Sequence, residues 1–209
     1  MGRLRVKRIG VMGGTFDPIH YGHLVTAEEA RTQFSLDEVL FVPTGKPPHK
    51  EEGESLDPEL RYLMTVIATS DNPKFKVSRI ETSRAGFSYT LGTIRELKRG
   101  YGKNTEIFFI TGADAILEIL TWKEPERILE ECYIIAATRP GYDLGKLKKA
   151  LPSSEKRRRK TNPRVIIMEI TALAISSTDI RERVAEGRPI RYLVPDGVVQ
   201  FIIKNGYYR

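Results

Sequence analysis

"GVMGGTFDPIHYGH" (residues 10–23) places two glycines, an Asp-Pro pair and two histidines directly after an apolar block, and this stretch decides the fold. Gly13 and Gly14 let the backbone turn sharply and let a ligand approach without a Cβ in the way. Pro18 fixes its own φ angle and restricts Asp17, so "TFDP" predicts a rigid corner. A helix is expected to begin directly after that corner.

Two imidazoles follow the corner. His20 and His23 are three residues apart, so in a first helical turn they project from the same face. The free N–H groups and the positive dipole end of that helix lie beside them, which predicts an anion site suited to a phosphate chain. A zinc site is the alternative. It is disfavoured because only His49 offers a third imidazole, no HExxH motif is present, and the single cysteine, Cys132, falls in a strand-like block.

Strand-length apolar blocks recur along the chain, dense in Ile, Val and Phe with weak alternation, as is typical of strands covered on both faces. They cover residues 8–13, 38–44, 75–81, 106–112, 132–138 and 164–170. Helical periodicity is expected over 23–34, 57–70, 88–100, 124–131, 177–187 and 195–206. The second of these helices is expected to begin with Asp57 as its N-cap and Pro58 at its first position. The alternation predicts an α/β fold, Rossmann-like and doubly wound, with a mainly parallel sheet and helices on both faces. We expect one domain over residues 1–209, with ligands outside the carboxyl ends of the strands.

Composition excludes several classes of protein. The 209 residues are 40% hydrophobic and 29% charged, which suits one domain with a proper core. No apolar run approaches the roughly 20 residues of a membrane helix, and the start "MGRLRVKR" lacks a secretory core. With a single cysteine, a cytoplasmic setting without a membrane is expected. The net charge of +7 owes much to 146–149 and 155–164, which we interpret as solvated loops in an enzyme that acts on polyanions.

"GGTFDPIHYGH" (13–23) resembles the signature of the nucleotidyltransferase superfamily that is named for its HxGH motif. From residue 9 to residue 207 the chain resembles the bacterial nicotinate-nucleotide adenylyltransferases. Further stretches recur in the order of that family: "PTGKPPHK" (43–50), "GFSYT" (86–90), "ITGADAILEILTW" (110–122), "TRPG" (138–141) and "ISSTDIR" (175–181). The resemblance implies that the AMP moiety of ATP is joined to nicotinate mononucleotide, giving nicotinate adenine dinucleotide and pyrophosphate in NAD biosynthesis.

The phosphate end of ATP is expected between two helix starts. In "ISSTDIR", Ser176 or Ser177 can cap a helix, and Arg181 one turn later can point at the same anion. An ordinary cap with a surface arginine is the alternative. The resemblance implies catalytic roles for His20, His23, Lys46 and Arg181. It implies ATP binding by Gly13, Gly14, Thr15, Phe16, Gly112, Asp114, Arg139, Ser176, Ser177 and Thr178. Asp114 is expected on the ribose hydroxyls, although it could simply cap the next helix.

The acceptor is expected near the second strand and the "GFSYT" helix start. Lys46 and His49 supply positive charge or donors on a proline-stiffened loop, which taken alone could be a basic surface loop. The resemblance implies that they face the phosphates or the acceptor nucleotide. Tyr89 and Thr90 are expected to bind a carboxylate, which favours nicotinate over nicotinamide. Trp122, the only tryptophan, is either a packing residue or a plane on which the pyridine ring stacks.

The expected chemistry needs no general base, because the attacking phosphate oxygen is already ionised at neutral pH. Catalysis would come from in-line positioning and charge stabilisation, with Mg²⁺ arriving on the triphosphate and no metal bound by the protein itself.

Four other functions are alternatives to this assignment. Transfer to nicotinamide mononucleotide instead of nicotinate mononucleotide is the most similar of them. Pantetheine-phosphate adenylyltransferases carry TxGH where this chain has His20, and class I aminoacyl-tRNA synthetases are longer. A nucleic-acid binder would use the basic run at 156–164. The oligomeric state stays open, and a homo-oligomer is compatible with the sequence. The roles of Arg139 and of residues 156–160 are also open.

Overall fold

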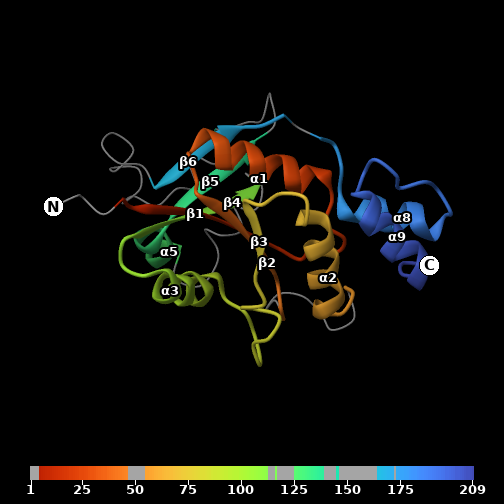
Figure 1. The fold of residues 1–209 in the computed structure, drawn as a ribbon, viewed down its shortest axis with the longest axis horizontal. Helices are drawn as coiled ribbons and strands as arrows, with labels where there is room; N and C mark the ends of the chain where they lie inside the picture. The colour runs from red at the N-terminus through yellow and green to blue at the C-terminus, as the bar shows by residue number, and fades with distance from the viewer. Residues whose placement is uncertain are drawn as a thin grey trace.

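The computed structural model describes residues 5–46, 55–112, 116, 125–138, 145, 164–171 and 173–209, and within them one parallel sheet forms (Figure 1). Its strands are β1 (Lys7–Gly14), β2 (Glu38–Pro43), β3 (Phe75–Val77), β4 (Thr105–Gly112), β5 (Tyr133–Thr138) and β6 (Val165–Glu169). Their order in the sheet is β3-β2-β1-β4-β5-β6, and every neighbouring pair is parallel. This is the strand order of a doubly wound Rossmann-like fold, so the predicted fold class is confirmed.

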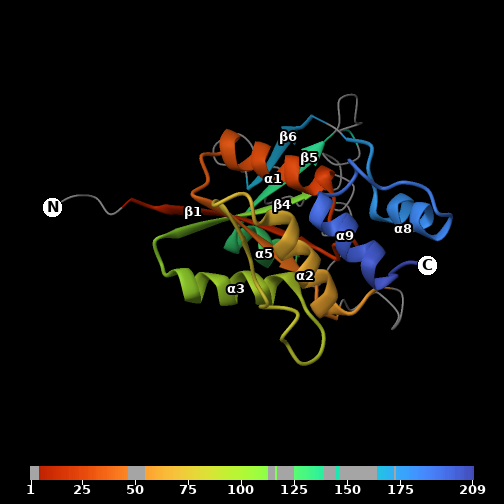
Figure 2. The same ribbon diagram turned by 45° about the vertical axis from the view of Figure 1, so that its right-hand side comes forward.

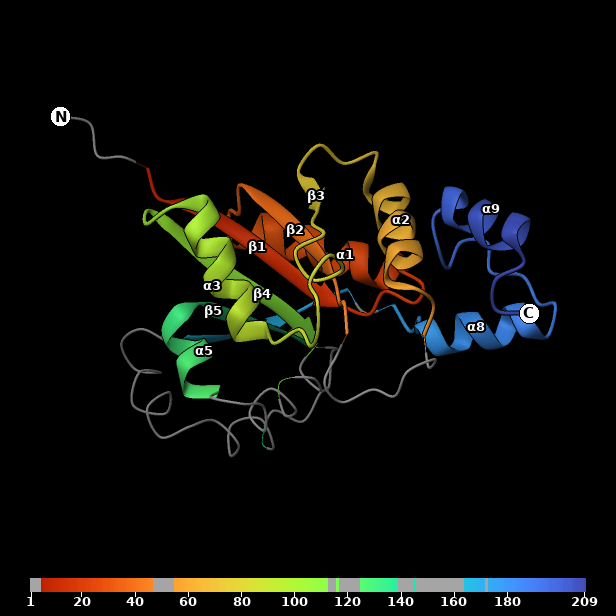
Figure 3. The same cartoon turned by 90° about the horizontal axis from the view of Figure 1, so that it is seen from below.

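Helices cover both faces of the sheet. Those with described bounds are α1 (Tyr21–Gln33), α2 (Pro58–Thr69), α3 (Thr90–Tyr101), α5 (Pro125–Glu131), α8 (Ser177–Ala185) and α9 (Asp196–Asn205). In Figure 1, α1 lies above the sheet whereas α3 and α5 lie below it, and in Figure 3 these two helices come to the front. Figure 2 shows α9 beside α2, with which it is in contact. Within the described residues, no helix combines the length and the apolar character needed to cross a bilayer.

The two faces carry separate buried clusters because successive residues of a strand point to opposite sides. On the central strand β1, Ile9 and Val11 belong to the cluster that includes the apolar residues of α3 and α5. Met12 belongs to the other cluster, which includes residues of α1, α2, α8 and α9. The strands are therefore covered on both sides, which explains their nearly continuous apolar runs.

One predicted strand is longer than the observed one. The sequence predicts a strand over 75–81, but β3 ends at Val77. Ser78 still pairs with β2, and Arg79 then opens a turn in which its carbonyl accepts a hydrogen bond from the Ser83 N–H (2.9 Å). Because β3 is an edge strand paired only with β2, little holds these later residues extended once the turn can form.

The start of α2 shows how local chemistry fixes a helix boundary. Asp57 is the N-cap, and its Oδ1 accepts a hydrogen bond from the Glu59 N–H at 2.8 Å. Pro58 occupies the first helical position, where its missing N–H is not needed. The predicted beginning of this helix is confirmed.

We expect Asp57→Ala to lower the free energy of unfolding by about 1 kcal/mol, because the cap is lost. The melting temperature should fall by roughly 2–4 °C. Urea denaturation measures the change, and Asp57→Asn, which keeps a capping oxygen, serves as the control. If the Asn variant loses as much stability as the Ala variant, the hydrogen bond to Glu59 is not the cause.

Candidate active site

A cavity of about 710 Å³ opens at the carboxyl ends of β1, β4 and β5. Helix α1, which follows β1, and helix α5, the next helix with described bounds after β4, pack on opposite faces of the sheet, so a crevice forms where the strand order reverses. The volume is in the usual range of small-molecule sites. The lining residues are Met12, Gly13, His20, Gly22, His23, Thr26, Ile110, Thr111, Gly112, Ala137, Thr138, Ile170, Leu173, Ile175, Ser176 and Ser177.

The corner between β1 and α1 brings its glycines and its aromatic ring together. Phe16 has a φ angle of 51°, a left-handed conformation that is uncommon for a bulky residue, and the Asp17–Pro18 peptide is cis. A Cβ on Gly14 would lie 2.9 Å from the Phe16 ring, so glycine is needed there for close approach. The Phe16 ring meets His23 edge to face, with ring centroids 5.0 Å apart. Gly13 lines the cavity itself.

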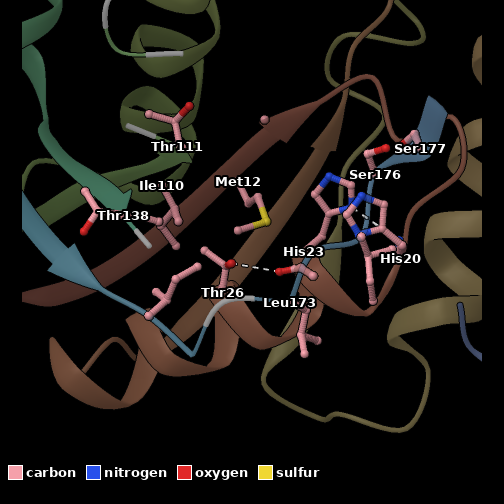
Figure 4. A pocket seen from close by; sticks show the side chains of 16 residues that line it. Met12, His20, His23, Thr26, Ile110, Thr111, Thr138, Leu173, Ser176 and Ser177 are labelled. Atoms are coloured by element: carbon pink, nitrogen blue, oxygen red, sulfur yellow. Dashed lines mark hydrogen bonds between the residues drawn. The ribbon is translucent and has the colours of Figure 1, made fainter. Parts of the chain in front are cut away.

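His20 and His23 lie together at the start of α1. The helix begins at Tyr21, two residues before the predicted start, because His20 is its N-cap. The backbone N–H of His20 donates to Nδ1 of His23 (3.2 Å), and the two rings stack with centroids 3.7 Å apart and planes at 26°. Figure 4 shows both rings side by side next to Ser176. Because Nδ1 of His23 accepts a hydrogen bond, the neutral ring carries its proton on Nε2.

Burial keeps both imidazoles neutral at pH 7. It lowers the pKa of His20 from 6.5 to about 4. The pKa of His23 lies well below 6.5, through burial first and the neighbouring His20 second. His20 is only 7% exposed, and its Nδ1 has no hydrogen-bond partner within the described part of the chain. Because His20 lines the cavity, an anion bound there would stabilise the protonated ring.

The N-terminus of α8 faces the same cavity, since Ser176 and Ser177 both line it (Figure 4). Ser176 is the N-cap, and its Oγ accepts a hydrogen bond from the Asp179 N–H (3.1 Å). The Oγ of Ser177 donates to the carbonyl of Pro18 (2.9 Å), which ties α8 to the corner. Two helix N-termini with their positive dipole ends therefore converge on one space, an arrangement suited to a polyanion.

Arg181 and Thr178 do not line the cavity. The position of Arg181 one turn into α8 predicts that its guanidinium can point at the bound anion. In the structure its Nη1 donates to the carbonyl of Asp17 (2.8 Å) and its Nη2 to Oγ1 of Thr178 (3.3 Å). These contacts hold α8 against the corner, and about a third of the arginine side chain, 34%, is exposed.

The candidate acceptor residues form a second group beside the cavity rather than in it. The carbonyl of Lys46 accepts a hydrogen bond from the Ser88 N–H (2.9 Å), and its Nζ lies 5.6 Å from the centroid of the Phe87 ring. Tyr89 caps α3, which begins at Thr90. The segment after β2 and the start of α3 thus lie side by side, with Phe87 and Tyr89 half exposed.

The remaining candidates divide into three sets. Gly112, at the end of β4, lines the cavity. Thr15 and Phe16 do not line it, and Phe16 is buried against Gly14. His49, Asp114, Trp122 and Arg139 lie outside the described residues. Among the described residues, no three His, Cys, Asp or Glu side chains gather as ligands for a metal ion.

Gly22 and Arg61 have no role among the expectations from sequence, but both contribute to the shape of the site. A Cβ on Gly22 would lie 3.0 Å from the His20 ring, so this glycine makes room for the imidazole. A signal was present, because glycine is a poor choice inside a helix unless space demands it. Arg61 on α2 is buried and binds backbone carbonyls of the loops around the site. In the sequence it looks like an ordinary charged residue on a helix.

Comparison with known proteins agrees with this geometry. A family model described as cytidylyltransferase-like matches residues 11–183. A protein of Moorella thermoacetica named as a probable nicotinate-nucleotide adenylyltransferase is 55% identical over 205 residues, which are 98% of this chain and 93% of that relative. A protein of the same name from Thermoanaerobacter sp. (strain X514) is 53% identical, covering 98% of this chain and 96% of the relative.

Solved structures share the fold. The nicotinic acid mononucleotide adenylyltransferase of Plasmodium falciparum, complexed with NaAD, superposes with a TM-score of 0.74 over 97% of both chains at 22% identity. The same enzyme complexed with APC gives a TM-score of 0.73 over 97% of both chains at 21% identity. At this level of identity the likeness concerns the arrangement of strands and helices.

The pKa of His20 should respond to a polyanion. We expect its imidazole to titrate near pH 4 in the free protein and at a higher pH with inorganic tripolyphosphate, because a nearby anion favours the charged ring. NMR titration of the imidazole resonances measures this, with the His20→Gln variant used for assignment. An unchanged His20 pKa under saturating tripolyphosphate would contradict an anion site at the start of α1.

Proposed function

The chain belongs to the cytidylyltransferase-like family, with nicotinate-nucleotide adenylyltransferases as its relatives, and we propose that it transfers the AMP moiety of ATP to nicotinate mononucleotide. The products are nicotinate adenine dinucleotide and pyrophosphate. The observation that carries the proposal is the meeting of two helix N-termini over one cavity, with His20 and His23 on one and Ser176 and Ser177 on the other. Such a pair can hold a triphosphate from two sides.

We assign the ATP side to the cavity. The triphosphate lies between the starts of α1 and α8, and Gly13 and Gly112 let the nucleotide approach the ends of β1 and β4. The two serines supply hydroxyls and backbone N–H groups at the α8 end. The roles of Thr15, Phe16, Asp114, Arg139, Thr178 and Arg181 rest on the family resemblance and stay predictions. Arg181 already donates to the carbonyl of Asp17 and to Thr178, and its remaining N–H groups are the ones available to a phosphate.

We assign the acceptor side to the group formed by Lys46 and the start of α3. The N-terminal N–H groups of α3, next to Tyr89 and Thr90, can bind the carboxylate of nicotinate. A carboxamide gains less there, because its NH₂ group is itself a donor. Lys46 would attract the acceptor phosphate. His49 and Trp122 complete this set by resemblance and stay predictions.

The reaction is a displacement at phosphorus. An ionised phosphate oxygen of the acceptor forms a bond to the α-phosphorus of ATP, and the bond to the leaving pyrophosphate breaks. The nucleophile is already an anion, so the protein has to align the groups and stabilise the charge that builds on the α-phosphate and on pyrophosphate. His20 and His23 donate to those oxygens, and protons acquired from solvent make them stronger donors when the polyanion is bound.

We propose that Mg²⁺ is carried by the triphosphate. Asp17, the carboxylate in the corner between β1 and α1, accepts hydrogen bonds from Tyr208 and Leu56. When bound with ATP, Mg²⁺ would offset part of the phosphate charge.

We further propose that residues 1–209 act as a single nucleotidyltransferase domain. The two buried clusters that support this idea share one sheet. A cytoplasmic setting stays a prediction from the single cysteine, Cys132. That thiol is buried, and burial raises its pKa to about 12, so it is unreactive. The partners we expect are the two small-molecule substrates.

Pyrophosphate release identifies the acceptor. The protein is incubated with MgATP and, separately, with nicotinate mononucleotide, nicotinamide mononucleotide or phosphopantetheine. We expect nicotinate mononucleotide to give the highest kcat/KM, because the start of α3 favours a carboxylate. A higher kcat/KM with nicotinamide mononucleotide would identify the amide as the acceptor. Pyrophosphate release with phosphopantetheine alone would refute the proposal.

Removal of either imidazole should slow turnover without unfolding the chain. We expect His20→Ala and His23→Ala to lower kcat by about 100-fold or more, which is the usual cost of one transition-state donor. Tyr21→Phe is the matched control, since Tyr21 lies between them in sequence but does not line the cavity. Circular dichroism and thermal melting check the fold. A histidine variant with wild-type kcat would remove that residue from the mechanism.

A further inference from the structure

Arg61 is a charged residue in a place where an apolar one is usual. It lies on α2 and is only 1% exposed. Its Nε donates to the carbonyl of Leu56 (2.8 Å) and its Nη1 to the carbonyl of Thr15 (2.6 Å). Its Nη2 donates to the carbonyls of Thr44 (2.8 Å) and Gly45 (3.4 Å). All four acceptors are backbone oxygens, and they belong to three separate segments of the chain.

Burial of a charged guanidinium carries a desolvation cost, and the surroundings of Arg61 offset this cost only in part. Burial lowers the pKa of Arg61, with the nearby Asp17 acting in the opposite direction. Asp17 is 3% exposed and accepts hydrogen bonds from the Tyr208 hydroxyl (2.6 Å) and the Leu56 N–H (3.4 Å). Well-packed apolar side chains commonly stabilise a core as well as buried charges do. Stability alone therefore does not explain an arginine here.

Three of the four acceptors, Thr15, Thr44 and Gly45, adjoin residues of the two proposed substrate sites. Thr15 is next to Phe16, whose ring supports His23 on the ATP side. Thr44 and Gly45 immediately precede Lys46 on the acceptor side. Gly45 is tightly held, because a Cβ there would lie 2.2 Å from the carbonyl of Glu81. One planar group thus joins the loop after β1 to the loop after β2.

We propose that Arg61 is a positioning residue that fixes the distance between the two substrate sites by holding the carbonyls of Thr15 and Thr44 on one rigid guanidinium. The proposal rests on the function given above and deepens it. A lysine has no planar fork and cannot hold both loops in the same geometry. In-line displacement is sensitive to alignment, so a shift of about 1 Å at either site is expected to slow the reaction strongly.

Arg61→Lys and Arg61→Met test the proposal through a split between binding and turnover. We expect kcat to fall by about 100-fold in Arg61→Lys, the cost of a small misalignment. The Kd for ATP, measured without acceptor, should stay within about threefold of wild type because Arg61 does not line the cavity. The KM for nicotinate mononucleotide should rise as the loop before Lys46 moves.

Met64→Ala is the matched control, because Met64 is fully buried on the same helix and belongs to the core rather than to the loops. It should lower the melting temperature through its cavity while kcat stays within about threefold of wild type. Each variant is assayed at the same interval below its own melting temperature. An equal loss of kcat in Met64→Ala overturns the proposal, as does wild-type kcat in Arg61→Lys.

Two outcomes separate this inference from the proposed function. Should the wild-type chain release no pyrophosphate from ATP and nicotinate mononucleotide, the function itself fails. Should wild type turn over and Arg61→Lys match it, only the positioning role fails. If neither Arg61 variant folds while Met64→Ala does, Arg61 serves stability and the positioning role is refuted.

Discussion

Six residues, 15–20, carry the chain from the sheet to its first helix, and the whole site depends on how this corner is held. Arg61 from α2 binds one carbonyl of the corner, and Ser177 and Arg181 from α8 bind two others. The hydroxyl of Tyr208 binds the Asp17 carboxylate within it. These partners are distant in sequence, so the shape of the corner is a product of the whole fold. His20 is the last residue of this corner, and its N–H in turn donates to Nδ1 of His23.

Much of the architecture could be predicted because it follows from local signals. Apolar blocks of strand length alternate with helical periodicity, and this alternation leads to a parallel sheet with helices on both faces. N-caps can be predicted because they depend on the side chain of one residue, and Asp57 and Ser176 are both observed as N-caps. The position of the cavity also agrees with the expectation that ligands bind where the strand order reverses, because the motif between β1 and α1 lies at that point.

What could not be predicted depends on tertiary contacts. Periodicity reports which residues of α2 are buried, but it does not tell which carbonyls a buried guanidinium such as Arg61 will reach. For the same reason the sequence does not reveal that Arg181 contacts the corner and Thr178. The run over 75–81 has strand composition throughout. Its second half forms a turn, because an edge strand such as β3 pairs with only one neighbouring strand, β2.

The stacked, neutral imidazoles have a consequence for which anions the site admits. Because His20 and His23 carry no fixed positive charge, the imidazoles offer little electrostatic attraction to a monovalent ion such as chloride. A ligand with several negative oxygens can draw protons from solvent onto the rings and so create its own counter-charge. Ligand binding is then linked to proton uptake, and discrimination among anions comes from the number of charges each one brings.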